Sequence, residues 1–297
     1  MLGHKMLQKL GERFDGVAGL MHGQADSPRF RHVPFLRSQR LVEGADAADW
    51  ERLHAILRQM RPACIVNCIG IIKQREEAHA AIPSLLINSL LPHRLAEASM
   101  EWGGRLIHFS TDCVFSGKRG GYCEEDPSDA LDLYGRTKFL GEVAGGNTLT
   151  LRTSIIGREL AGFRSLLEWF LAQRGSTVQG YRAALYSGVT TNYLAGLVAR
   201  IIQFHPGLTG LYHVAGPAIS KYDLLCLIRD TFRLDIGIQP VKGEVCDRTL
   251  RADRFLAATG YGCPDWPELI AELHQDPTPY ASWRNTNTGE GAGELAR

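Results

Sequence analysis

The chain has 297 residues, of which 44% are hydrophobic and 22% charged, as in an ordinary soluble globular protein. A formal net charge of +1 gives no global case for binding nucleic acid or an anionic membrane. The longest apolar runs are far short of the roughly 20 residues of a membrane span, and the N-terminus lacks a signal-peptide profile. These features predict a cytoplasmic protein without nucleic-acid or membrane partners.

Seven cysteines without a regular spacing favour reduced thiols over a disulfide framework. Cys64 and Cys68 lie in or beside an apolar strand, which supplies neither the turn nor the second ligand pair of a zinc site. We therefore expect no metal. The sequence does not fix the oligomeric state, and a homodimer stays open.

Strands and helices are predicted to alternate from residue 14 to residue 156, as in the open α/β sheets that bind dinucleotides. Such a fold should begin with a strand, but the N-terminus predicts a helix. Leu2, Met6, Leu7 and Leu10 follow the helical period, whereas the fold would begin with a strand and a Gly-rich turn that binds the pyrophosphate. Either the true start lies upstream, or the protein lacks a central strand. We favour an upstream start, because the loss of a middle strand would expose two sheet edges.

The next predicted strand, residues 14–21, bears on cofactor choice. An NAD-preferring fold places an acid after this strand to bind the ribose 2′-hydroxyl, but His22 and two uncharged residues follow here, with Arg29 and Arg31 further on. Without an acid to repel it, a 2′-phosphate is tolerated, so NADPH is favoured and NADH stays possible. The two arginines fit solvated loop positions equally well.

Residues 46–60 are predicted to form an amphipathic helix, and residues 64–70 a buried strand that ends in a glycine. Pure core packing explains the apolar residues of this strand but not Asn67. Residues 82–102 are predicted to form a long helix, which leads into the next strand.

The stretch 105–143 organises the predicted sheet. A buried strand ends in Ser-Thr-Asp (110–112), at the carboxyl end where open α/β sheets bind ligands. A Gly-rich loop and a helix follow, with Tyr134 four places before Lys138 and so on the same helix face. A neighbouring ammonium favours the phenolate and lowers the pKa of a tyrosine from about 10 towards working pH. Tyr134 could then exchange a proton with an oxygen that the Thr111 hydroxyl also reaches.

Tyr134 and Lys138 alone would also fit a surface contact on any amphipathic helix, but the sequence around them is specific. The block HFSTDCVFSG, then Tyr122, Glu124 and Asp126, then LYGRTKFLGE, resembles the extended short-chain dehydrogenase/reductases. More narrowly, it resembles the dTDP-4-dehydrorhamnose reductases and related nucleotide-sugar reductases. Cys113 stands where that pattern has tyrosine.

The resemblance implies a catalytic trio of Thr111, Tyr134 and Lys138, with Asp112 touching the substrate. It implies that Leu2 and Gly3 are the tail of the Gly-rich turn and that residues 67–70 run along the cofactor. The cofactor contacts expected on this basis are Gly3, His4, Asn67, Cys68, Ile69, Gly70, Ser110, Tyr134 and Lys138.

After residue 157 the strand–helix alternation loosens. Residues 149–156 and 210–216 are predicted strands, and 165–173, a segment from Thr191 and a segment after Ser220 are predicted helices, the last with a capping-box-like start. Arg182 is a substrate candidate, because arginine binds diphosphates in a bidentate manner, although solvent exposure is the commoner fate. The cluster of Arg248, Arg251 and Arg254 fits phosphate binding and a solvated face equally.

We therefore expect an α/β protein, a doubly wound, mostly parallel sheet of the NAD(P)-binding Rossmann type with a smaller α/β substrate-binding portion. The expected division is a dinucleotide-binding domain at 1–157, a mainly substrate-binding portion at 158–283 and a disordered tail at 284–297.

The expected activity is NADPH-dependent reduction of a 4-keto nucleotide sugar in deoxysugar biosynthesis. Two alternatives stay open: an epimerase or dehydratase of the same superfamily, and a non-catalytic regulatory subunit with this fold, as in methionine adenosyltransferase.

Overall fold

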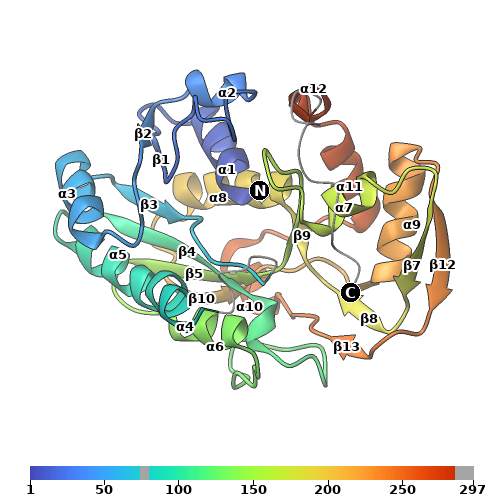
Figure 1. Ribbon diagram of the computed structural model, residues 1–297. Helices are drawn as coiled ribbons and strands as arrows, with labels where there is room; N and C mark the ends of the chain where they lie inside the picture. The colour runs from blue at the N-terminus through green and yellow to red at the C-terminus, as the bar shows by residue number, and fades with distance from the viewer. Residues whose placement is uncertain (74–79, 285–297) are drawn as a thin grey trace.

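A computed structural model describes residues 1–73 and 80–284 of the chain. Its centre is a four-stranded parallel sheet in the order β10-β5-β4-β3 (Figure 1). The strands are β3 (Cys64–Asn67), β4 (Arg105–Thr111), β5 (Thr148–Thr153) and β10 (Gly210–His213). β4 is buried at all seven positions, as expected for a strand covered on both faces.

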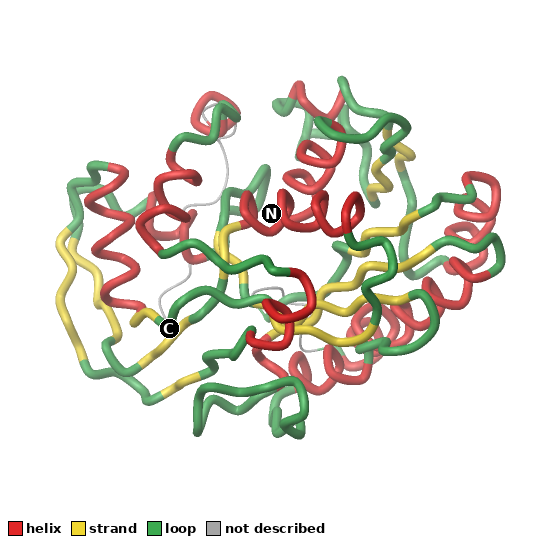
Figure 2. The backbone as a smooth tube through the Cα atoms, turned by 180° about the vertical axis from the view of Figure 1, so that it is seen from behind, coloured by secondary structure: helices red, strands yellow, loops and turns green. Residues whose placement is uncertain are grey.

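Helices cover both faces of this sheet, which confirms the doubly wound α/β class (Figures 1 and 2). One core joins Ile107, Phe109 and β5 to α1 (Leu2–Gly11), α8 (Thr191–Phe204) and α10 (Asp253–Thr259). The other joins Leu106 to α3 (Trp50–Met60) and α5 (Leu91–Met100). Because successive strand residues point to opposite faces, β4 contributes to both cores.

A second parallel pair, β1 (Gly19–Met21) and β2 (Leu41–Glu43), is separate from the four-stranded sheet. Within the described residues β1 pairs only with β2, and β3 pairs only with β4. Each of β1 and β3 thus has one edge without a strand partner in this part of the chain. The short α2 (Pro34–Arg37) lies between β1 and β2 in sequence.

Apart from β10, α8 and α10, the elements from β6 to α11 form a smaller α/β region around a third core (right side of Figure 1). Its strands form the groups β12-β7, β11-β8-β13 and β6-β9. The elements not yet given are β6 (Ile155–Ile156), α7 (Leu166–Leu171), β7 (Thr177–Tyr181), β8 (Ala184–Tyr186), β9 (Val189–Thr190), β11 (Ile219–Ser220), α9 (Lys221–Phe232), β12 (Gly237–Val241), β13 (Cys246–Asp247), α11 (Trp266–His274) and α12 (Tyr280–Arg284). The expected domain boundary at residue 157 stays a prediction.

Several predicted elements are shorter or divided. The strand expected at 14–21 is β1 alone, and the strand expected at 149–156 is split into β5 and β6. The long helix expected at 82–102 consists of α4 (Ala81–Ser84), the π-helix η2 (Leu85–Leu90) and α5. The Ser220 side chain caps α9 as predicted, accepting from the Asp223 N–H at 3.0 Å. Of the tail expected at 284–297, residues 285–297 lie outside the described residues.

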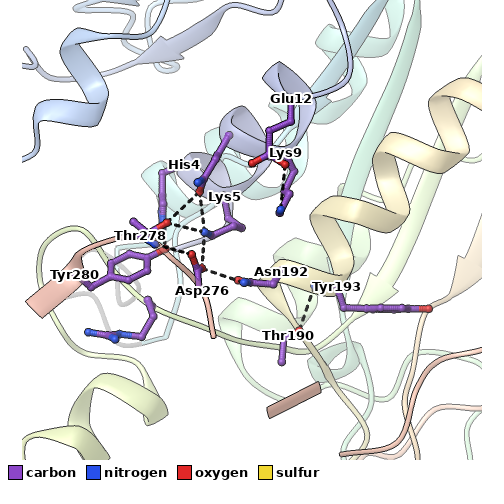
Figure 3. Close-up of polar contacts among 12 residues, drawn as sticks. His4, Lys5, Lys9, Glu12, Thr190, Asn192, Tyr193, Asp276, Thr278 and Tyr280 are labelled. Atoms are coloured by element: carbon purple, nitrogen blue, oxygen red, sulfur yellow. Dashed lines mark hydrogen bonds and ion pairs between the residues drawn. The ribbon is translucent and has the colours of Figure 1, made fainter. Parts of the chain in front are cut away.

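The N-terminal helix is fixed by a buried ion pair (Figure 3). Lys5 Nζ lies 2.5 Å from Asp276 Oδ2, and the two side chains are 1% and 3% exposed. Asp276 also accepts from Asn192 Nδ2 at 2.9 Å and from the Thr278 N–H at 3.0 Å. These bonds hold the pKa of the Asp276 carboxyl below its usual value against the opposing effect of burial. One carboxylate therefore joins α1, α8 and the segment after α11.

Replacing Asp276 by Ala should be strongly destabilising, because it leaves the Lys5 ammonium buried without a counter-charge. We expect a loss of roughly 3–5 kcal/mol in the free energy of unfolding, measured by denaturant titration. Glu12→Ala is the matched control: it removes the acid of the solvent-exposed Lys9–Glu12 pair and should cost less than about 1 kcal/mol. Equal losses in the two variants would contradict this account.

Candidate functional site

The helix α6 (Leu133–Leu140) carries Tyr134 and Lys138 and is anchored at both ends. Asp132 caps its start by accepting from the Gly135 N–H at 2.7 Å. A Cβ at Gly135 would clash with the Cys113 carbonyl oxygen, and one at Gly141 with that of Asn88. Two glycines therefore let α6 approach the end of β4 and η2 closely.

Lys138 points into the protein towards β4. Its side chain is buried, and Nζ donates to the Phe109 carbonyl oxygen at 2.6 Å. The His108 ring lies on the same side, with Nε2 3.5 Å from Nζ. Burial lowers the pKa of Lys138 to about 8, although the nearby Glu142 carboxylate acts in the opposite direction. The lysine therefore loses its proton within a working pH range.

Tyr134 is half-buried one turn before Lys138. Its pKa is raised above the ordinary value, chiefly because burial disfavours the phenolate, while the Thr111 hydroxyl that bonds the phenol acts in the opposite direction. The expectation that Lys138 lowers this pKa is wrong for the cofactor-free protein, because burial dominates and Nζ is directed at Phe109. Lys73 lies over the phenol ring, 5.7 Å from its centroid. The structure thus places Tyr134 against Thr111 of the predicted catalytic trio, with Lys138 one turn further along α6.

Asp112 follows Thr111 at the carboxyl end of β4 and begins the short 3₁₀ helix η3 (Asp112–Val114). Its Oδ1 accepts from the Thr111 hydroxyl at 3.1 Å, and its side chain is 9% exposed. Burial raises the pKa of its carboxyl despite that bond and the nearby Arg248 and Lys73 cations. A carboxylate in this position can accept hydrogen bonds from the hydroxyls of a bound ligand.

The segment after β3 lies beside the start of α1. The Asn67 amide oxygen accepts from the Ile69 N–H at 3.0 Å, and an added Cβ on Gly3 would lie 3.7 Å from the Cys68 Cβ. Asn88 bonds both the N–H and the carbonyl of Ile71, at 2.9 and 3.0 Å. Gly3 thus lies beside Cys68 of the segment 67–70, and the expected contacts of these residues with a cofactor stay a prediction.

Other predicted contacts are placed differently. His4 Nε2 bonds the Tyr280 hydroxyl at 2.7 Å in a buried position (Figure 3), so its ring points towards the C-terminal segment. The Ser110 hydroxyl donates to Glu142 Oε1 at 2.6 Å. Arg182 is exposed just after β7, and its guanidinium lies 4.3 Å from the centroid of the Tyr222 ring. The predicted cofactor role of His4 and substrate role of Arg182 therefore have no described contact in support.

Sequence reasoning missed a buried ion pair beneath the site. Arg152 of β5 bonds Glu142 with two nitrogens, each at 2.7 Å, and the two side chains are 3% and 7% exposed. Glu142 also accepts from Ser110 of β4. The pair therefore fixes the end of α6 to two strands. In the sequence the pair is visible only as an arginine inside the predicted strand 149–156 and a glutamate just after the Tyr-x-x-x-Lys segment.

Arg248 is the member of the arginine cluster that reaches the site. Its Nε donates to the Phe115 carbonyl oxygen at 2.8 Å, and the Asp112 and Asp132 carboxylates favour the charged guanidinium, so that its pKa is raised against the effect of burial. Arg251 pairs with Asp253 and Arg254 with Glu125, both in exposed positions. Nothing in the spacing of the three arginines distinguishes Arg248.

Two surface cavities lie away from the trio. One, of about 280 Å³, is lined by residues of α1, α8 and α11, and the other, of about 490 Å³, by residues of α3 and Arg61. In the described part of the chain, no helix is both long and apolar enough to cross a bilayer. All seven cysteines are free.

A doubly wound parallel sheet with a Tyr-x-x-x-Lys helix at its carboxyl edge defines a protein of the short-chain dehydrogenase/reductase class. Residues 22–254 match the family model described as the RmlD substrate binding domain, so the chain belongs to that family. The resemblance to the dTDP-4-dehydrorhamnose reductases is thereby confirmed.

Similar proteins include enzymes and a regulatory subunit. The chain is 31% identical over 306 residues to a probable dTDP-4,6-dihydroxy-2-methyloxan-3-one 4-ketoreductase of Streptomyces antibioticus, covering 93% of this chain and 92% of that protein. It is 24% identical over 267 residues to methionine adenosyltransferase 2 subunit beta of Xenopus tropicalis, covering 84% and 75%. The fold is similar to dTDP-4-dehydrorhamnose reductase from Bacillus anthracis, solved in complex with NADP, with a TM-score of 0.70 at 20% identity over 86% of this chain and 97% of that one.

Gly135→Ala should impair the site although alanine is the better helix former. The intrinsic gain of roughly 1 kcal/mol should be outweighed by the clash with the Cys113 backbone, for a net loss of about 1–3 kcal/mol in unfolding free energy and a displaced Tyr134. Gly145→Ala is the matched control, because no atom lies within 4 Å of its added Cβ. A stabilised Gly135→Ala protein would show that the close approach is not required.

Proposed function

We propose that this protein is an NADPH-dependent reductase of a 4-keto nucleotide sugar. The observation that carries the proposal is the placement of Tyr134, buried Lys138 and Thr111 around the carboxyl end of β4. That end of a parallel strand is where open α/β sheets bind their ligands. The 31% identity to a sugar 4-ketoreductase over 93% of the chain supports the same reaction.

The residues present fit a dinucleotide. The start of α1 has no side-chain cap, and the backbone N–H groups at a helix N-terminus favour phosphate. Gly3 lies beside Cys68 of the segment 67–70 in this region, and Lys138 belongs to the proposed trio at the carboxyl end of β4. Bound NADPH would supply a hydride to the keto carbon. The relative solved with NADP and the lack of an acid after β1 favour NADPH over NADH.

The trio accounts for the proton half of the reaction. The Thr111 hydroxyl orients the keto oxygen, and the Tyr134 phenol donates its proton to that oxygen as the carbon is reduced to an alcohol. The raised pKa keeps the phenol protonated until an alkoxide, which is the stronger base, develops. The positive charge of Lys138, one helix turn away, would limit the cost of the tyrosinate until solvent returns the proton, although burial leaves the pKa of Tyr134 above its ordinary value.

The part of the site proposed to face the substrate is polar and contains both negatively and positively charged side chains. Asp112 would accept bonds from sugar hydroxyls, while Arg248 and Lys73 are cations whose charge acts on its carboxyl. A guanidinium is suited to a diphosphate, so we assign the diphosphate contact to Arg248 in place of Arg182. We further propose a cytoplasmic protein that acts on a nucleotide-activated sugar, with a homodimer left open.

The similarity to methionine adenosyltransferase 2 subunit beta supports a non-catalytic regulatory subunit as the second candidate. A fluorescence titration with NADPH followed by a turnover assay separates the candidates. Cofactor binding without turnover of any 4-keto nucleotide sugar would favour the regulatory role. A nicotinamide retained through purification would favour an epimerase or dehydratase.

Tyr134→Phe removes only the phenolic hydroxyl. Turnover should fall by about 10²–10⁴-fold, the usual contribution of a positioned general acid, whereas the NADPH affinity should change little. Tyr181→Phe is the control, since this exposed tyrosine lies in the separate β7–β12 pair. Loss of NADPH binding together with turnover would argue that Tyr134 is structural.

The pH profile should follow Lys138. Its pKa of about 8 means that the amine is charged below this pH and neutral above it. Since only the ammonium stabilises the tyrosinate, kcat/KM should decline as the pH rises through about 8. Lys138→Met should lower kcat/KM and abolish this decline, as measured by steady-state kinetics from pH 6 to 10. A profile with the same decline in both proteins would assign it to another group.

A further inference from the structure

A buried histidine connects the segment after β3 to the lysine of the trio. His108 lies in β4, directly beside Asn67 in the register of the two parallel strands, and its side chain is 0% exposed. Its Nδ1 lies 3.1 Å from Asn67 Nδ2, and its Nε2 lies 3.5 Å from Lys138 Nζ. Both ring nitrogens therefore face nitrogen atoms, which restricts where the protons can be.

The orientation of the Asn67 amide is fixed by a backbone donor. The Ile69 N–H points at the Asn67 amide at 3.0 Å, and of the two ends of that amide only the oxygen can accept a hydrogen bond, since the NH₂ group is a donor. The amide oxygen must therefore face Ile69, and the amide NH₂ must face the imidazole. Asn67 thus donates to His108 Nδ1, which acts as an acceptor and carries no proton.

The remaining imidazole proton is consequently on Nε2. Burial, with the added effects of Lys138 and His93, lowers the pKa of His108 well below its usual value, so the ring is neutral. A neutral imidazole carries one N–H, and this N–H is directed at Lys138 Nζ. An ammonium has no lone pair to accept it, whereas a neutral amine does.

We propose that His108 is a positioning residue whose Nε2–H, set by Asn67, favours the neutral amine of Lys138 over the ammonium. The order of donors is Ile69 N–H to Asn67, Asn67 to His108, and His108 to Lys138. The segment expected to run along the cofactor thereby influences the charge of the lysine. The tautomer of His108 and its effect on Lys138 do not depend on the proposed function; only the catalytic role of Lys138 rests on it.

Other charges around Lys138 do not reproduce this effect. Glu142, which follows α6, favours the ammonium but is held by Arg152 of β5. Within the described residues, the titratable and charged groups of this region are Tyr134 and Glu142 of the α6 segment, His108 of β4, Arg152 of β5, which pairs with Glu142, His93 of α5, which acts on His108, and Lys73, which lies over the Tyr134 ring. Of these, His108 is the one with a ring N–H directed at Nζ.

The tautomer can be tested in the wild-type, cofactor-free protein. The ¹⁵N NMR spectrum of histidine-labelled protein, with His108 assigned by its absence in His108→Phe, should show a protonated Nε2 and an unprotonated Nδ1. A proton on Nδ1, or on both nitrogens, would overturn the proposal. The experiment needs one variant, His108→Phe, for the assignment, and its result does not depend on turnover.

Reversing the direction of the hydrogen bonds that run from Asn67 through His108 tests their effect on the pKa of Lys138. In Asn67→Asp the new carboxylate accepts from both Ile69 and His108, so the imidazole proton moves to Nδ1 and the Nε2 lone pair faces Lys138. The Lys138 titration midpoint, followed by ¹³C NMR of its ε-carbon and assigned with Lys138→Arg, should rise by about one pH unit or more.

The same substitution in a His108→Phe background is the matched control. In that background the new carboxylate can act on Lys138 only through space, so the rise in the Lys138 titration midpoint should be clearly smaller. An equal rise in both backgrounds would overturn the relay through His108. Absence of reductase activity in the wild-type protein would instead contradict the proposed function and leave these two titrations valid.

Discussion

The hydrogen bond from Lys138 to the Phe109 carbonyl is the interaction on which the site depends. It requires a long cationic side chain to enter the protein and meet a backbone acceptor at 2.6 Å. Burying an ammonium is costly unless it is bonded, and here the cost is limited because the amine can lose its proton near neutral pH. The same bond fixes the rotation of α6 and so determines where Tyr134 points.

The geometry of β4 makes this arrangement possible. Its alternate side chains serve different purposes: Ile107 and Phe109 enter the core under α1 and α8, whereas His108 and Ser110 face α6. A strand buried on both faces usually carries apolar residues throughout. Two polar residues are tolerated on one face because each has a partner, Lys138 for His108 and Glu142 for Ser110.

The first helix depends on a different buried charge. Lys5 and Asp276 join the two ends of the described chain (Figure 3), and Leu7 of α1 lies beside Gly19 of β1. At the start of the same helix, Gly3 meets the segment after β3. The position of the proposed phosphate-binding end of α1 is therefore decided by contacts with α8 and with the segment that follows α11.

The sequence alone determined the α/β class, the place of the Ser-Thr-Asp strand end and the Tyr-x-x-x-Lys pair, because these depend on local periodicity and on spacing within one helix. Only the tertiary structure decided the directions of side chains that meet across elements. It turned His4 towards Tyr280, left Arg182 on the surface, brought Arg248 near Asp112 and set His108 between Asn67 and Lys138. It also reversed the expected pKa shift of Tyr134, since burial depends on packing between elements distant in sequence, which spacing along one helix does not encode.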